Sequence, residues 1–162
     1  MGTETTTRTI RVERVLPASA DRLWPAMQHP SAFLYVTRGV LGFPSLAGRT
    51  EPFVEGEADS GRLWLFHVLP LSRHHIHLVE VDATTRTMRT EEHGGLLRRW
   101  DHTLHVEPVD DRHSRYSDEV VLDAGMLTTV VARVAIALFR YRQLRWRRLA
   151  RRHLGAGPML RK

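Results

Sequence analysis

The alternation of apolar and polar residues along the chain predicts an antiparallel sheet. Residues 9–16 (TIRVERVL) alternate clearly enough to predict a first strand. Between residues 48 and 124, turn signals recur every 8–14 residues, as a meander of antiparallel strands requires. The loop at 38–50, which holds three glycines and Pro44, is expected to carry little regular structure. The six further strands are expected at residues 49–57, 63–70, 74–82, 87–93, 97–108 and 115–124.

Two short helices are expected between the first and second strands. Ser19 is a candidate N-cap for the first of them, and Pro25 keeps that helix short or kinked. Pro30 opens the second helix, and Gly39 ends it.

A third, long helix is predicted from Gly125 to about His153, a stretch without proline or glycine after its first residue. Its length would be about 42 Å at 1.5 Å per residue. Apolar residues recur at helical spacing, interrupted by Arg145, and predict the buried face. They are Leu127, Val130, Val131, Val134, Leu138, Tyr141 and Leu149.

The last strand indicates which strand positions face the core. Its even positions are mostly apolar and its odd positions mostly polar, so the even face is expected to point inward and to carry Asp118 with it. In the preceding strand the even positions are Trp100, His102, Leu104 and Val106, so His102 is also expected to point inward. A hairpin turn near Asp110 would pair His102 with Asp118, and Leu104 with Tyr116.

An inward histidine beside an inward carboxylate has two interpretations. The pair could be structural, two polar groups that satisfy each other and specify the strand register. It could instead contact a ligand or move a proton, with the carboxylate selecting the imidazole tautomer. The sequence alone leaves both open. Other polar residues, namely His67, His75, His77, Glu91 and Glu92, are weaker candidates. No metal site is expected, because His75 and His77 have no third ligand at a defined spacing.

Several segments resemble one protein superfamily. These are LPASADRLWPAM, EEHGGLLRRWDHTLHVEP, RYSDEVVLDAG and LFRYRQLRWRRL. Together with the predicted order of elements, they resemble the START and birch-pollen-allergen superfamily, which includes polyketide cyclase/dehydrase-like proteins. The resemblance covers residues 8–153. It implies an α+β helix-grip fold, in which a curved antiparallel sheet of about seven strands wraps around the long C-terminal helix.

The resemblance also implies an apolar cavity between sheet and helix that holds a lipid, a polyketide or an isoprenoid-like molecule. The leading expectation is therefore a protein that binds a small apolar ligand, without a cofactor. The residues expected to line the cavity are Trp100, His102, Leu104, Tyr116, Asp118, Val120, Val134 and Leu138. The alternative is a cyclase, aromatase or dehydratase, a lyase or isomerase in which His102 and Asp118 are catalytic and Tyr116 or Arg98 steadies an oxyanion.

Charge and composition add a third hypothesis. The net charge of +6 is concentrated in seven arginines between Arg140 and Arg152, with no acid among them. This segment could contact an anionic membrane surface or RNA, although no RNA-binding motif accompanies it and nucleic acid is not the expected partner.

The 162 residues are expected to form a single domain, ordered from about 8 to 153 with tails at 1–7 and 154–162. The domain could be a monomer or a homodimer. The absence of cysteine and of an apolar leader segment fits a protein of the cytoplasm. The resemblance implies a bacterial protein, since the motifs are similar to those of a bacterial branch of the superfamily.

Overall fold

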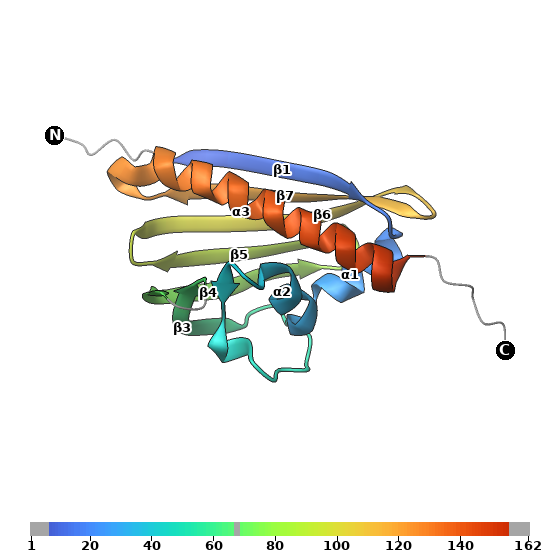
Figure 1. The fold of residues 1–162 in the computed structure, drawn as a ribbon, viewed down its shortest axis with the longest axis horizontal. Coiled ribbons are helices and arrows are strands. Elements are labelled where there is room, and N and C mark those ends of the chain that lie inside the picture. The colour runs from blue at the N-terminus through green and yellow to red at the C-terminus, as the bar shows by residue number, and fades with distance from the viewer. Residues whose placement is uncertain (1–6, 67–68, 156–162) are drawn as a thin grey trace.

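The computed structural model describes residues 7–66 and 69–155 (Figure 1). The predicted tails therefore lie largely outside the described residues, as does His67. Seven strands and three α-helices are present in the described part, with short 3₁₀ segments at Pro44–Leu46 and Gly125–Leu127 and a π-helical turn at Ala150–Leu154. In chain order the main elements are β1 (Arg8–Leu16), α1 (Ala20–Met27), α2 (Pro30–Thr37), β2 (Leu41–Gly42), β3 (Ala58–Leu65), β4 (Leu69–Asp82), β5 (Thr87–Gly94), β6 (Leu97–Asp110), β7 (His113–Asp123) and α3 (Thr128–Leu149).

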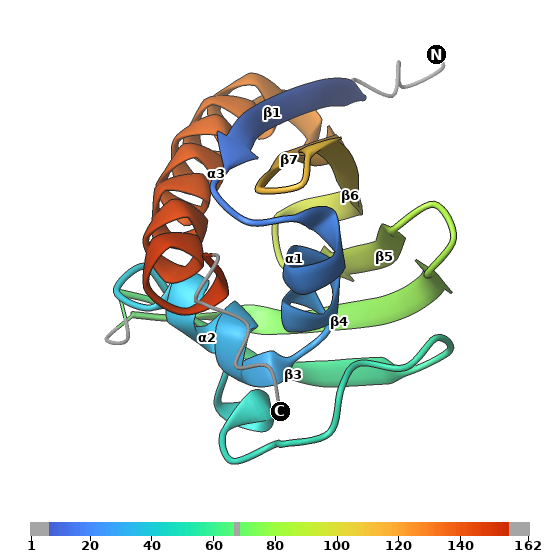
Figure 2. The same cartoon turned by 90° about the vertical axis from the view of Figure 1, so that its right-hand side faces the viewer.

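The strands form one antiparallel sheet in the order β1-β7-β6-β5-β4-β3-β2. Seen end-on, the sheet curls, and α3 lies along its inner side next to β1 (Figure 2). The short helices α1 and α2 stand beside α3 at one end of the sheet (Figure 2). This is the predicted helix-grip arrangement, and both short helices lie where the sequence predicts them.

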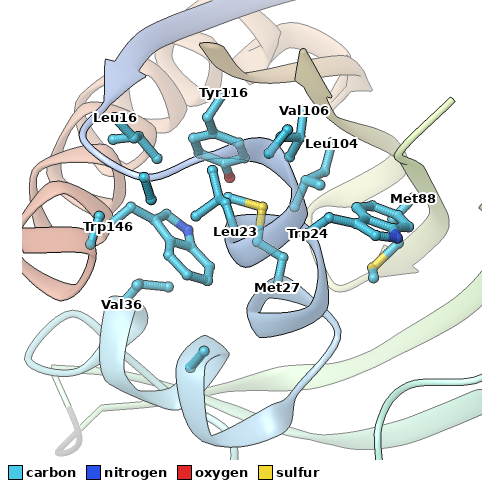
Figure 3. Close-up of a cluster of buried hydrophobic side chains, with 14 of the residues drawn as sticks. Leu16, Leu23, Trp24, Met27, Val36, Met88, Leu104, Val106, Tyr116 and Trp146 are labelled. Atoms are coloured by element: carbon cyan, nitrogen blue, oxygen red, sulfur yellow. The ribbon is translucent and has the colours of Figure 1, made fainter. Parts of the chain in front are cut away.

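Apolar residues from the inner face of the sheet and from all three α-helices form the core. Figure 3 shows the larger of two clusters, in which α1 is surrounded by residues from β5, β6, β7 and α3. The smaller cluster joins β1 and β7 to the first half of α3. On β7 the buried apolar side chains are Tyr116, Val120 and Leu122. The predicted inward face of the last strand is therefore confirmed.

The second predicted strand is wrong. Residues 49–57 form a loop, and β3 begins at Ala58, within the segment expected to be a turn. Pro52 lies in the middle of this loop, and Gly56 has a φ of +87°, a left-handed conformation that strands do not use. The seventh strand is instead the two-residue β2 inside the loop at 38–50, which pairs with the end of β3.

The predicted buried face of the long helix is wrong in part, because Val131 and Leu149 do pack against the core clusters but two other valines do not. Val130 and Val134 are 56% and 63% exposed, so Val134 points away from the sheet and cannot line its inner face. Small residues at Ala132 and Ala135 let the helix lie close to the sheet, with Phe139 between Trp100 and His102. The buried side chains of α3 are Thr128, Ala132, Ala135, Phe139, Arg142, Gln143 and Trp146.

Candidate functional site

His102 and Asp118 do meet on the inner face of the sheet. The Nε2 atom of His102 lies 2.9 Å from Oδ1 of Asp118. The predicted register is wrong by two residues, because Leu104 pairs with Asp118 and His102 pairs with Val120. The hairpin turn is centred between Asp111 and Arg112 and not at Asp110, since Asp110 pairs with His113, and an irregularity between Pro108 and Asp110 then changes the register by one residue. A shift of two preserves the facing of every side chain, so the two groups still meet diagonally across the strands.

Asp118 is completely buried and accepts hydrogen bonds from three side chains. Besides His102, the Tyr116 hydroxyl donates to Oδ1 over 2.5 Å, and Gln143 Nε2 donates to Oδ2 over 3.2 Å. Burial alone would raise the pKa of Asp118, but the hydrogen bond from His102 and the positive charge of Arg142 outweigh it and lower that pKa. Burial, and then the charge of Asp118, raises the pKa of Tyr116 well above its usual value. Asp118 is therefore an anion beside a neutral phenol.

This carboxylate determines the tautomer of His102. An ionised carboxylate only accepts hydrogen bonds, so the proton of the neutral imidazole sits on Nε2, and Nδ1 remains an acceptor. Nδ1 has no hydrogen-bond partner among the described residues. The ring packs on Phe139 with centroids 5.0 Å apart, and the His102 side chain keeps 12% of its surface exposed. Trp100 stacks on the same phenylalanine. His102 therefore presents Nδ1 as an oriented acceptor within an aromatic surface made of Trp100 and Phe139.

Two polar residues of α3 complete this cluster, and sequence reasoning missed both. Arg142 is buried and places its guanidinium 5.1 Å from the ring centroid of Phe139 and 5.7 Å from that of Phe33. Gln143 also donates to the backbone oxygen of Val12 on β1 over 2.8 Å. A helical wheel centred on Ala132, Ala135 and Phe139 would have placed both residues on the inner side.

A second histidine–carboxylate pair lies on the same face of the sheet. His74 Nε2 is 2.7 Å from Oε2 of Glu92, and Thr90 Oγ1 donates to Oε1 over 2.6 Å. Gly94 allows this end of β5 to lie against β4, because a Cβ atom there would collide with the backbone of Arg73 and lie 2.9 Å from the Cα of His74. His74 and the inward-facing Leu78 are both at even positions of β4. This alternation is the sequence signal that would have placed His74 on the inner face. Of the two candidate glutamates, Glu92 points inward and Glu91 is exposed.

The other residues predicted to line the site lie partly in the core and partly on the surface. Leu104, Tyr116 and Val120 are packed in the core, Trp100 and Leu138 are half-buried, and Val134 faces outward. Arg98 packs against Gly125 at the start of α3 and does not join the His102 cluster. His75 and His77 lie on the outer face. In the part of the chain that the structure describes, no group of three metal-ligating side chains occurs.

A shallow hollow of about 320 Å³ opens at the β3 side of the sheet. It is lined by Leu34, Gly42, Phe43, Pro44 and Trp64. Phe43 also borders a much smaller space of about 10 Å³ beside His74 and Ile76. The apolar space was expected between the sheet and the C-terminal helix, whereas this hollow lies against α2, β2 and β3. Phe43 is the one residue that lines both spaces.

Comparisons with known proteins match this chain by family and by fold. Residues 45–153 match the family model described as "Domain of unknown function (DUF8410)". No curated protein matches the chain.

Three of the similar solved structures cover nearly the whole chain. Norcoclaurine synthase from Thalictrum flavum, in complex with dopamine and hydroxybenzaldehyde, has a TM-score of 0.67 at 15% identity, over 94% of this chain and 91% of its own. The Zhui aromatase/cyclase from Streptomyces has a TM-score of 0.64 at 12% identity, over 93% and 99%. A protein from Thermus thermophilus has a TM-score of 0.62 at 15% identity, over 87% and 95%. At these identities the likeness shows a common fold.

Proposed function

Because the chain belongs to the family described as a domain of unknown function (DUF8410) and has the helix-grip fold of the START and birch-pollen-allergen superfamily, we propose its function from the site itself. It binds a small, largely apolar molecule on the inner face of β4, β5 and β6. We place this activity in the bacterial cytoplasm, in a monomer or homodimer that needs no cofactor.

The observation that carries this proposal is the state of His102. Its Nε2 is held by Asp118, its Nδ1 has no partner among the described residues, and its ring lies beside Trp100 and Phe139. An aromatic surface removes an apolar ligand from water, and one oriented acceptor selects a ligand that carries a hydroxyl group. Two of the similar structures support this proposal, since one holds dopamine and hydroxybenzaldehyde and another is an aromatase/cyclase.

Native mass spectrometry of the freshly purified protein tests the proposal. We expect a bound species of small mass that is released when the protein is denatured in organic solvent. Thr90 faces inward and pairs with His102 across β5 and β6, so Thr90→Phe should fill the site and abolish the bound species. Arg89→Phe is the matched control, because Arg89 lies on the same strand and is exposed on the other face. Equal occupancy in the two variants would rule out this location.

Catalysis by the same group is a second candidate. A histidine oriented by a buried carboxylate is the arrangement of a general base. His102 could remove a proton from an enolisable ligand, return it to a leaving hydroxyl, and so run a cyclase or dehydratase reaction. Arg98 is too far along β6 to steady an oxyanion here, and the Tyr116 hydroxyl already donates to Asp118. Replacing His102 by Ala should then abolish turnover of an enolisable polyketide substrate while leaving its affinity nearly unchanged. A binding protein would show no turnover in either form.

Contact with an anionic membrane surface is favoured by a separate observation on the outer face of α3. Met126 is fully exposed, and Val130 and Val134 are more than half exposed. No acidic residue occurs after Asp123. The exposed arginines that follow on the same helix and its last turn are Arg133, Arg140, Arg148, Arg151 and Arg152. Exposed apolar side chains beside cations suit a lipid headgroup layer better than RNA, which offers them no apolar surface. Within residues 7–66 and 69–155, no helix is both long and apolar enough to pass through a bilayer.

The structure narrows which arginines can make such a contact. Arg142 is buried, and Arg145 donates to the backbone oxygen of Tyr35 and lies over its ring. Cosedimentation with vesicles of phosphatidylserine and phosphatidylcholine tests the contact. Val130→Asp should reduce the bound fraction, and so should raised salt. Equal binding to pure phosphatidylcholine vesicles would contradict an electrostatic contribution.

A further inference from the structure

The second histidine–carboxylate pair repeats the chemistry of the first. Glu92 holds His74 through Nε2, and Thr90 occupies the other oxygen of the carboxylate. As with His102, the proton of a neutral imidazole then sits on Nε2, and Nδ1 is left as an acceptor. Nδ1 of His74 has no partner among the described residues. The side chains of His74 and Glu92 are only 9% and 13% exposed, so the pair is mostly buried but still reaches solvent.

The two pairs belong to one continuous inner surface. Thr90, which donates to Glu92, pairs directly with His102 across β5 and β6, and Glu92 pairs with Trp100. The surface between the two imidazoles is therefore made of Trp100, Thr90 and the inward Ile76. His74 also borders the small space behind Phe43, on the side of the sheet where the shallow hollow opens. The two imidazoles thus lie on the same inner surface, one on β4 and one on β6.

We propose that His74 is a second polar contact for the ligand, so that the bound molecule is elongated, apolar along its body, and carries a hydrogen-bonding group at each end. This inference rests on the proposed binding function and specifies its ligand class. His102 receives one end of the molecule, and His74 receives the other.

The sheet geometry sets the spacing between the two ligand groups. Leu78, which pairs with Thr90, lies four residues from His74 along β4. Two strand spacings of about 4.8 Å and four residues of about 3.3 Å place the Cα atoms of His74 and His102 about 16 Å apart. Side chains on one face of a sheet stand roughly perpendicular to it, so the two imidazoles have about the same spacing as their Cα atoms. Two hydrogen bonds of about 2.8 Å take up about 6 Å of that span, which leaves about 10 Å between the polar groups of the ligand. That distance corresponds to two fused or linked aromatic rings with a hydroxyl at each end.

Two biphenyl probes that differ by one hydroxyl test the inference by isothermal titration calorimetry. One is para-hydroxybiphenyl, and the other is its para,para′-dihydroxy analogue. We expect the wild-type protein to bind the dihydroxy probe about five-fold more tightly, which corresponds to one additional hydrogen bond of about 1 kcal/mol. His74→Phe, which keeps the ring and removes the nitrogens, should bring the two affinities together. His77→Phe is the matched control on the outer face of the same strand and should leave the preference intact.

The outcomes separate this inference from the function on which it rests. If both probes bind the wild type equally and His74→Phe changes neither affinity, His74 is not a ligand contact, although the binding function stands. If neither probe binds, both proposals fail. The double variant His74→Phe, Glu92→Gln, which leaves no unpaired carboxylate at the site, replaces His74→Phe if thermal unfolding shows that the single variant is not folded. A preference that survives in the folded variant overturns the inference.

Discussion

Replacing Asp118 by alanine is the most informative test of the buried cluster. The substitution removes the acceptor of three donors at once, those of His102, Tyr116 and Gln143. A buried donor left without a partner costs about 1–3 kcal/mol. His102 keeps some exposure and can turn to water, so we take the lower part of that range for each donor. The expected loss in the free energy of unfolding is about 3–5 kcal/mol, a large fraction of the stability of a domain this size.

Urea denaturation followed by circular dichroism measures this loss, and the neighbouring residue supplies the control. Glu119 lies next in β7 but points outward, where its carboxylate is 3.6 Å from the exposed Arg11. Glu119→Ala should therefore cost no more than about 0.5 kcal/mol. If Asp118→Ala costs no more than Glu119→Ala, the carboxylate does not hold the cluster together, and the orientation of His102 has another origin.

Three further predictions concern the same region. Because the folded pKa of Asp118 is lowered, its ionised form stabilises the fold above the unfolded pKa, and this contribution is lost as the pH falls through the folded value. The difference in unfolding free energy between the wild type and Asp118→Asn should thus shrink as the pH falls below about pH 4. Gly94→Ala should lower the melting temperature and the affinity for the dihydroxy probe, because the new Cβ would push β5 away from Arg73. Phe139→Ala should cost about 3–5 kcal/mol of stability in urea denaturation, whereas Val134→Ala should cost less than about 0.5 kcal/mol; equal losses would mean that the helix faces are reversed.

The sequence predicted the fold and one of the two histidine pairs, for a physical reason that can be traced. The period of two in β7 showed which of its side chains face inward, and parity survives any register error of an even number of residues. His102 and Asp118 were therefore found although their register was wrong. The irregularity between Pro108 and Asp110 left no signal in the pattern, because it depends on how the turn closes.

The errors on α3 have a different cause. Apolar residues cover most sides of its first half, so the pattern favours the larger valines as the buried face, whereas the alanines allow the closer approach to the sheet. Arg142 and Gln143 were missed because a polar residue is buried only when tertiary structure supplies a partner. For Gln143 that partner is Asp118, and no property of the helix sequence predicts it.

Gln143 connects the stability of the fold to the chemistry of the site. One amide group donates both to the backbone oxygen of Val12 on β1 and to Asp118 on β7, so it ties α3 to two strands while it helps hold the carboxylate that orients His102. A change at Gln143 must therefore loosen the helix and disturb the imidazole together. A change at His102 removes one of the three donors to Asp118, but it leaves the bonds from Tyr116 and Gln143 in place. The imidazole is thus the member of the cluster that can contribute to function at the smallest structural cost.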